Sequence, residues 1–336
     1  MLEERKKRVL QAIVELYIQT AEPVSSNAIM NLDGLEYSSA TIRNEMAILE
    51  NLGYIEKNHI SSGRIPSEAG YKYYVKNLMK PKELTGEDVL KLQTIFKNNE
   101  LELSTSINKT VEIISELTNY TSIVLGKSSS ENTLKQVNII PISDNKIVAL
   151  VCTNKGIVEN KQFVLTNEAE INEVVKTSEI INKMLVGTPI NEVATRLEFE
   201  IKPIISRQIK QYETVYNIFA DAFNDFLNKS QNIYFGGKTK IFDEPEYDNA
   251  KEIKILASKF ENREFIKRIE EDSDDGEVKV YIGTETDFDP NVTIIKSKYK
   301  LNGEEGTIAI VGPKRMEYDR VVGLLEYLKK ELNDED

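Results

Sequence analysis

Residues 37–53, with the sequence YSSATIRNEMAILENLG, combine an apolar stripe with a face of small and hydrogen-bonding side chains. On a helix of 3.6 residues per turn, five apolar residues share one side: Ile42, Met46, Ile48, Leu49 and Leu52. The opposite side carries Ala40, Arg43, Asn44 and Ala47. A solvated amphipathic helix, which is the alternative interpretation, normally has Glu and Lys on its outer face.

These outer side chains match the edges of DNA bases in the major groove. Arginine can donate two parallel hydrogen bonds to guanine, asparagine can pair with adenine, and alanine can pack on the thymine methyl group. Small neighbours let the helix approach another surface closely, and a serine can cap its first turn. The candidate DNA contacts here are Ser38, Ser39, Ala40, Thr41, Arg43, Asn44 and Ala47.

A second stretch, HISSGRIPSEAGYKYYV at 59–75, places hydroxyl groups, a glycine and an arginine at the tip of an expected hairpin. Such groups suit contacts to phosphate or insertion into the minor groove. The alternative is an ordinary turn with a structural glycine and proline. The candidates in this stretch are His59, Ser61, Ser62, Gly63 and Arg64, with Tyr71 and Lys72 supporting them at phosphate.

The elements around these residues predict a DNA-binding fold. Apolar periodicity, capping serines and the stops at Glu22-Pro23 and Gly53 place helices at 3–20, 26–30 and 39–52, a strand at 54–56, a turn at 58–64 and a helix at 67–79. Three helices followed by a short hairpin are the order of a winged helix-turn-helix.

The remainder predicts an α+β domain with a mainly helical insertion. Helical patterns cover 84–119, 168–229, 249–270 and 317–332. Strand-like runs occur at 121–126, 134–142 and 146–153, and again in NIYFGG, VKVYIG, VTIIKSKY and GTIAIVGP.

Composition argues against catalysis. The 336 residues include one His and one Cys, so neither a thiolate–imidazole metal cluster nor a cysteine framework is expected, and no catalytic set is evident. We therefore predict a protein that is not an enzyme, has no cofactor, and lacks a signal peptide or membrane span, which suggests a cytoplasmic location.

The net charge of −12 is unevenly distributed along the chain. Residues 1–80 contain ten basic and ten acidic residues, which leaves 33 basic and 45 acidic residues in the rest. Because local patches decide contact with polyanions, the N-terminal part is expected to be the DNA-binding part.

The helix ETVYNIFADAFNDFL at 213–227 carries aromatic residues along one side. Such residues are enriched at subunit interfaces, so we consider a dimer contact here, with burial inside its own domain as an equally weighted alternative. The residues concerned are Val215, Phe219, Phe223 and Phe226.

Several segments resemble the heat-inducible transcription repressor HrcA family. They are VSSNAIM, YSSATIRNEMAILENLGYI and HISSGRIPSEAGYKYYV near the N-terminus, followed in the same order by NIYFGG, EPEY, VYIGTE and GTIAIVGPKRMEY. The resemblance implies a winged-helix domain at 1–80, a GAF-like domain at 81–167 and 231–336, and an inserted dimerisation domain at 168–230. It also implies a homodimer that represses chaperone operons through an inverted-repeat operator in double-stranded DNA, with the chaperonin GroE promoting the active state.

Two other classes of function are compared with this one. A small-molecule-responsive winged-helix regulator would need a ligand pocket with convergent polar groups in the GAF-like domain, and no such set is evident in the sequence. An enzyme would need a catalytic set that the composition lacks.

Overall fold

The computed structural model divides into two compact units, Met1–Leu125 with Ile233–Asp336, and Gly126–Asn232. Each unit has its own hydrophobic core and is treated by itself. The structure describes residues 2–32, 37–57, 63–96, 103–126, 132–154, 156–165, 171–230, 233–244, 249–262, 266, 268–269, 277–301 and 304–333.

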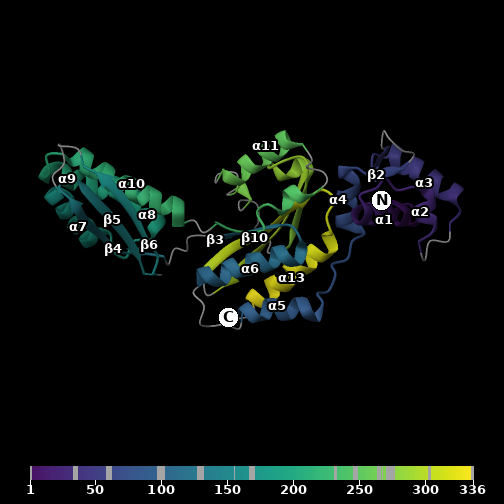
Figure 1. Ribbon diagram of the computed structural model, residues 1–336, viewed down its shortest axis with the longest axis horizontal. Helices are drawn as coiled ribbons and strands as arrows, with labels where there is room; N and C mark the ends of the chain where they lie inside the picture. The colour runs from purple at the N-terminus through teal and green to yellow at the C-terminus, as the bar shows by residue number, and fades with distance from the viewer. Residues whose placement is uncertain are drawn as a thin grey trace. The chain divides into compact units, whose positions relative to one another are not determined.

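The first unit begins with the predicted helices and hairpin (Figure 1). These elements are α1 (Glu4–Thr20), α2 (Ser26–Met30), α3 (Ser39–Asn51), β1 (Ile55–Lys57), β2 (Arg64–Pro66) and α4 (Glu68–Asn77). Ser25, Ser38 and Ser67 cap α2, α3 and α4, each accepting a hydrogen bond from a backbone N–H in the first turn. The predicted winged helix-turn-helix order is confirmed.

Helix α3 buries a narrower stripe than the sequence predicts. Ile42, Met46 and Leu49 are in the core, whereas Ile48 and Leu52 are 39% and 54% exposed. Ile48 is six residues after Ile42 and therefore does not share its face of the helix. Leu52 is the C-cap residue, just after the last residue of α3. The apolar side of α3 is therefore limited to positions that repeat every three or four residues.

The rest of the first unit is a five-stranded sheet with helices on both faces (Figure 1). The strand order is β7-β3-β10-β9-β8. The strands are β3 (Thr121–Gly126), β7 (Ile233–Gly236), β8 (Lys279–Ile282), β9 (Val292–Leu301) and β10 (Glu304–Pro313). The helices are α5 (Gly86–Phe96), α6 (Leu103–Thr118), α11 (Ala250–Glu261) and α13 (Tyr318–Asn333), with 3₁₀ turns η2 (Lys240–Asp243) and η4 (Gly283–Thr286).

Alternation along the strands explains the layers. In β10, Ile308 and Ile310 join the core that includes α6 and α13, while Ala309 and Val311 join the core that includes α11. A strand presents successive side chains to opposite faces, so both faces of this sheet need a helical cover. The core on the α6 and α13 side continues without a break into the core of the winged helix.

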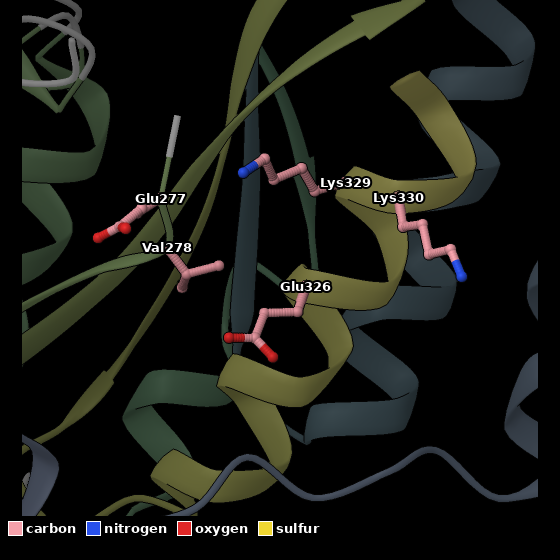
Figure 2. Close-up of a pocket in the computed structure, with 5 residues that line it drawn as sticks. All are labelled: Glu277, Val278, Glu326, Lys329 and Lys330. Carbon is pink, nitrogen blue, oxygen red and sulfur yellow. The ribbon is translucent and has the colours of Figure 1, made fainter. Parts of the chain in front are cut away.

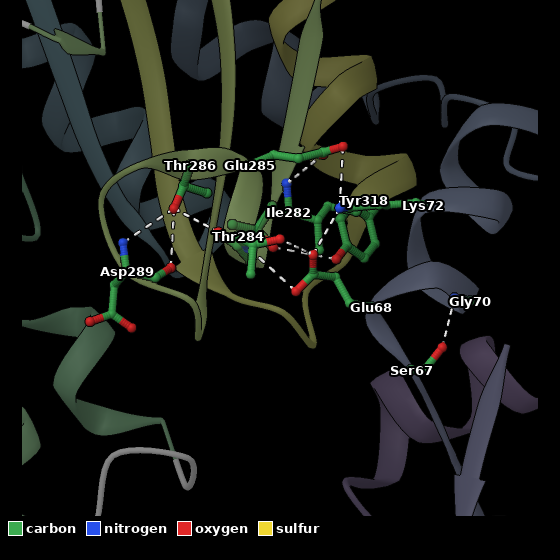
Figure 3. Close-up of polar contacts among 12 residues, drawn as sticks. Ser67, Glu68, Gly70, Lys72, Ile282, Thr284, Glu285, Thr286, Asp289 and Tyr318 are labelled. Atoms are coloured by element: carbon green, nitrogen blue, oxygen red, sulfur yellow. Dashed lines mark hydrogen bonds and ion pairs between the residues drawn. The ribbon is translucent and has the colours of Figure 1, made fainter. Parts of the chain in front are cut away.

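A polar joint connects α4 of the winged helix to η4 at the edge of the sheet (Figure 3). The carboxylate of Glu68 accepts hydrogen bonds from the Thr284 hydroxyl at 2.6 Å, the Thr284 amide at 3.3 Å and the Lys72 ammonium at 2.8 Å. Gly283 has φ +59°, and a Cβ there would lie 2.1 Å from Oε2 of Glu68. The close approach therefore requires glycine at position 283.

Apolar and charged contacts reinforce this joint. Tyr318 at the start of α13 is fully buried, with its ring centroid 5.9 Å from that of Tyr71 on α4. Arg315 donates from Nη1 to the Ile18 carbonyl at 3.0 Å and contacts Glu244 at 3.1 Å. The winged helix and the sheet thus share a packed boundary within one unit.

Replacing Glu68 by Gln is expected to lower the free energy of unfolding by about 1–2 kcal/mol, because the variant loses charge-assisted hydrogen bonds. Burial tends to raise the pKa of Glu68, but hydrogen bonds from Lys72 and Thr284 outweigh it and hold that pKa below the ordinary value of a glutamate carboxyl. A depressed carboxyl pKa contributes stability above its unfolded value and loses it as the pH falls through the folded value. The gap between wild type and variant should therefore narrow below about pH 4.5.

Urea denaturation at several pH values measures this effect. The control is Glu87→Gln, which removes an exposed i,i+4 ion pair with Lys91 on α5 and should change stability by no more than about 0.5 kcal/mol. Equal losses in the two variants, or a gap independent of pH, would argue against a stabilising joint at Glu68.

The second unit packs helices on one face of a three-stranded antiparallel sheet of order β4-β5-β6. The strands are β4 (Leu134–Ser143), β5 (Lys146–Thr153) and β6 (Val158–Val164). The helices are α7 (Ile171–Leu185), α8 (Ile190–Arg196), α9 (Lys202–Gln208) and α10 (Tyr212–Ser230), with a π-helical turn η1 (Leu197–Ile201). Val137, Ile147 and Val151 face the helices and are buried.

The insertion is longer than the sequence prediction of 168–230. Its strands, expected to belong to the domain at 81–167, form a separate sheet inside the unit 126–232. The chain leaves the larger sheet at the end of β3 and returns in β7, where Leu125 pairs with Ile233. Two neighbouring strands therefore bracket the whole excursion, a long-range pairing that the local sequence does not indicate.

The predicted dimer contact on α10 is wrong. Val215, Phe219, Phe223 and Phe226 are at most 1% exposed and lie in the core of the second unit. Side chains that are buried within their own subunit have no surface to offer to a second copy. The structure agrees with the other interpretation of the aromatic stripe, in which the helix packs into its own domain.

Candidate nucleic-acid interface

Helix α3 presents the predicted contact residues to solvent. Ala40, Arg43, Asn44 and Ala47 are all exposed, and Thr41 is half-buried beside the capping Ser38. The opposite face of the helix is in the core of the winged helix. The structure therefore brings these residues together on one open surface, as the spacing predicts.

An open cleft lies beside this surface. Its lining comes from α2, α3 and the hairpin and includes Ser25, Ser26, Asn27, Arg43, Met46, Lys57 and Arg64. Glu50 is the counter-ion of two of these residues, with its Oε2 2.7 Å from Arg64 Nη2 and its Oε1 3.8 Å from Lys57 Nζ. Hydroxyls, an amide and three cations are groups that bind phosphate oxygens or base edges.

The residues predicted from the sequence do not include Ser25, Ser26, Asn27 and Lys57, which also line this cleft. The first three lie in or before α2, which contacts α3 across the turn of the helix-turn-helix. Lys57 ends β1 and its side chain is 66% exposed. The order of elements predicts that α2 packs against α3, but which α2 side chains reach the contact face depends on the turn between the helices.

The candidate DNA contacts in the hairpin differ in where the structure places them. His59, Ser61 and Ser62 lie outside the described residues. Gly63 is buried, and a Cβ there would come within 2.7 Å of Pro23, so its close packing explains the glycine and the predicted DNA contact is not supported. Arg64 is in β2 with a side chain only 16% exposed, and its Nε donates to Glu50 at 2.8 Å.

Tyr71 and Lys72 are not placed for the predicted phosphate contacts. Tyr71 is 3% exposed and packs against Tyr318. Lys72 forms ion pairs with Glu68 at 2.8 Å and with Glu285 at 3.2 Å in the joint with the sheet (Figure 3). Both residues stabilise the position of α4, and neither belongs to the open face of α3.

A second cleft lies between the start of β8 and helix α13. Figure 2 shows Glu277 and Val278 on one side and Glu326, Lys329 and Lys330 of α13 on the other. This lining is open and mainly charged, whereas small-molecule sites are usually enclosed and mainly apolar. It gives no support to a ligand-binding role for this cleft.

Within the described ranges, no group of three or more His, Cys, Asp or Glu residues is placed to hold a metal ion. No helix in the part of the chain that the structure describes is long and apolar enough to cross a membrane.

Comparison with known proteins covers nearly the whole chain. The description "Winged helix-turn-helix transcription repressor, HrcA DNA-binding" matches residues 1–77, and "HrcA protein C terminal domain" matches residues 104–322. The heat-inducible transcription repressor HrcA of Bacillus pumilus strain SAFR-032 is 37% identical over 99% of this chain and 98% of its own length. The protein of the same name from Lysinibacillus sphaericus is 35% identical, over 99% and 97%.

A solved structure shares the fold. It is described as a hypothetical protein at 2.2 Å resolution, and it matches with a TM-score of 0.63 and 22% identity over 99% of this chain and 98% of that one. With both family descriptions matched and relatives above 30% identity over nearly their full length, the chain belongs to the HrcA family.

Proposed function

We propose that this chain is a DNA-binding transcription repressor that recognises an inverted-repeat operator as a homodimer. The observation that carries the proposal is the exposed row Ala40, Arg43, Asn44 and Ala47 on α3, in a winged-helix domain of the HrcA family. The relatives are named heat-inducible transcription repressors, which supports the control of heat-shock operons. Helix α3 enters the major groove with this row against the base edges.

Two basic residues beside α3 add contacts to the DNA backbone in this proposal. Lys57, with an exposed side chain, and Arg64, which lines the cleft in an ion pair with Glu50, face the DNA backbone on the hairpin side. Phosphate contacts of this kind set register and affinity, while the α3 side chains set base preference. The acidic remainder of the chain disfavours nonspecific wrapping of DNA, so binding is confined to the winged-helix face.

The homodimer is supported by a partly open sheet face in the second unit. The face of β4-β5-β6 opposite the packed helices carries Ile140, Val158 and Val164, which are 43%, 56% and 66% exposed. Exposed apolar patches often mark contacts between proteins. A two-fold dimer joined through this unit gives two copies of α3, which suits two operator half-sites.

From the family we expect that the chaperonin GroE promotes the state of the protein that binds DNA. From the family we also expect the α+β domain to be GAF-like. A small-molecule-responsive regulator is the second candidate function, and the charged open cleft of Figure 2 does not favour it.

Selection of bound DNA from a random pool by the full chain tests the proposal. We expect enrichment of an inverted repeat, because a two-fold protein places two identical helices on two half-sites. A single asymmetric site would contradict the dimer, and a pool without enrichment would contradict sequence-specific repression. A parallel selection with Arg43→Ala should yield sites with relaxed preference within each half-site.

A further inference from the structure

Ser39, in the first turn of α3, is the centre of a small hydrogen-bond network. Its Oγ lies 3.1 Å from the Nη2 of Arg43, which donates to it from one turn further along the helix. The same oxygen donates to Oδ1 of Asn27 on α2 at 3.1 Å, and it lies 3.1 Å from Oγ of Ser26. Three contacts therefore converge on one hydroxyl at the junction of α2 and α3.

The capacity of a hydroxyl determines the direction of these bonds. A serine Oγ has one proton to donate and two lone pairs that accept. Arg43 can only donate, so it occupies one lone pair, and the Ser39 proton goes to Asn27. Ser26 is then the donor to the second lone pair, and every position on the Ser39 oxygen is used.

We propose that Asn27 is a positioning residue that controls base specificity through Ser39 and Arg43 without itself touching a base. This inference rests on the proposed function, because it assigns the network to the orientation of Arg43 at the DNA. Asn27 orients the Ser39 hydroxyl, which then holds one N–H of the Arg43 guanidinium. The other four N–H groups of arginine remain for a bidentate contact to guanine.

Preorganisation gives this network its effect. An exposed arginine has many rotamers, and fixing one of them on binding costs conformational entropy. A side chain that is already oriented before binding loses less freedom, and a bidentate contact depends strongly on geometry. Removing the Asn27 acceptor lets the Ser39 hydroxyl rotate, because its proton loses this partner. The Ser39 oxygen then holds the Arg43 guanidinium less firmly, and the guanidinium samples directions that suit other bases.

The test measures binding of the full-length protein to its selected operator and to operators with single base-pair changes. Asn27→Ala should reduce discrimination about three- to tenfold at the base pair where Arg43→Ala also reduces it. In the Arg43→Ala background, Asn27→Ala should have no further effect, because the residue through which it acts is gone. Asn27→Asp retains the acceptor oxygen, so it should keep discrimination while its charge weakens binding to all sequences.

Controls separate this role from others. Asn31→Ala removes an exposed asparagine at the end of the same helix and should leave base preference unchanged, and melting temperatures show that each variant is folded. A uniform loss of affinity with a smaller salt slope would make Asn27 a phosphate contact and overturn the proposal. Additive effects of Asn27→Ala and Arg43→Ala on discrimination would also overturn it while leaving the repressor function intact. If Arg43→Ala itself left base preference unchanged, the failure would lie in the proposed role of α3.

Discussion

Phe219→Ala is expected to destabilise the unit formed by residues 126–232 by about 3–5 kcal/mol. Phe219 is fully buried on α10 and packs in a core with Phe223 and Phe226. Truncation to alanine removes buried apolar surface and leaves a cavity that the surrounding helices fill only in part. The loss should therefore appear in the free energy of unfolding of this unit, whatever the concentration of the protein.

Hydrogen exchange of peptides from 171–230 across a denaturant series measures this loss without depending on the first unit. Phe199→Ala is the matched control, because Phe199 is 74% exposed and its truncation should change stability by about 0.5 kcal/mol or less. If Phe219→Ala kept the stability of the unit and dissociated a dimer, α10 would be a subunit interface and its assignment to the core would fail.

Arg43→Ala should cost about 1–3 kcal/mol of binding free energy on the preferred operator and relax the base preference at one position. Arg43 is exposed on α3, so its removal takes away the proposed bidentate base contact and not part of the core. The melting temperature should therefore stay the same. Equilibrium binding to matched and single-base-changed operators across a salt series provides the measurement.

Lys57→Ala is the control that removes the same charge from the same cleft. Because Lys57 is assigned to phosphate, its loss should weaken all sequences alike and lower the slope of log K against log salt by about one. If Arg43→Ala also weakened every sequence equally, with base preference unchanged, Arg43 would be a phosphate contact. The outward face of α3 would then not be explained by base recognition.

The sequence by itself determined the local elements and the outward face of α3. Helix α3 follows from a capping Ser38 and a three-to-four-residue apolar repeat, and these properties involve residues at most one turn apart. The same repeat turns Arg43 and Asn44 outward, so the candidate site on α3 could be predicted without the fold. Strands β9 and β10 likewise follow from runs of β-branched residues, which have a local preference for extended backbone.

Only the tertiary structure decided what covers each face. A helix with an aromatic stripe has the same periodicity whether it packs into its own domain or against a second copy, and the contacts of Phe219 with its own domain exclude the second case. From the sequence alone, Lys72 is a plausible phosphate contact. The fold instead places the carboxylate of Glu285, more than two hundred residues later in the chain, 3.2 Å from its ammonium group. The insertion begins at 126 because Leu125 pairs with Ile233 across the whole excursion. These outcomes depend on contacts between distant segments, which periodicity and capping do not encode because both act within a few residues.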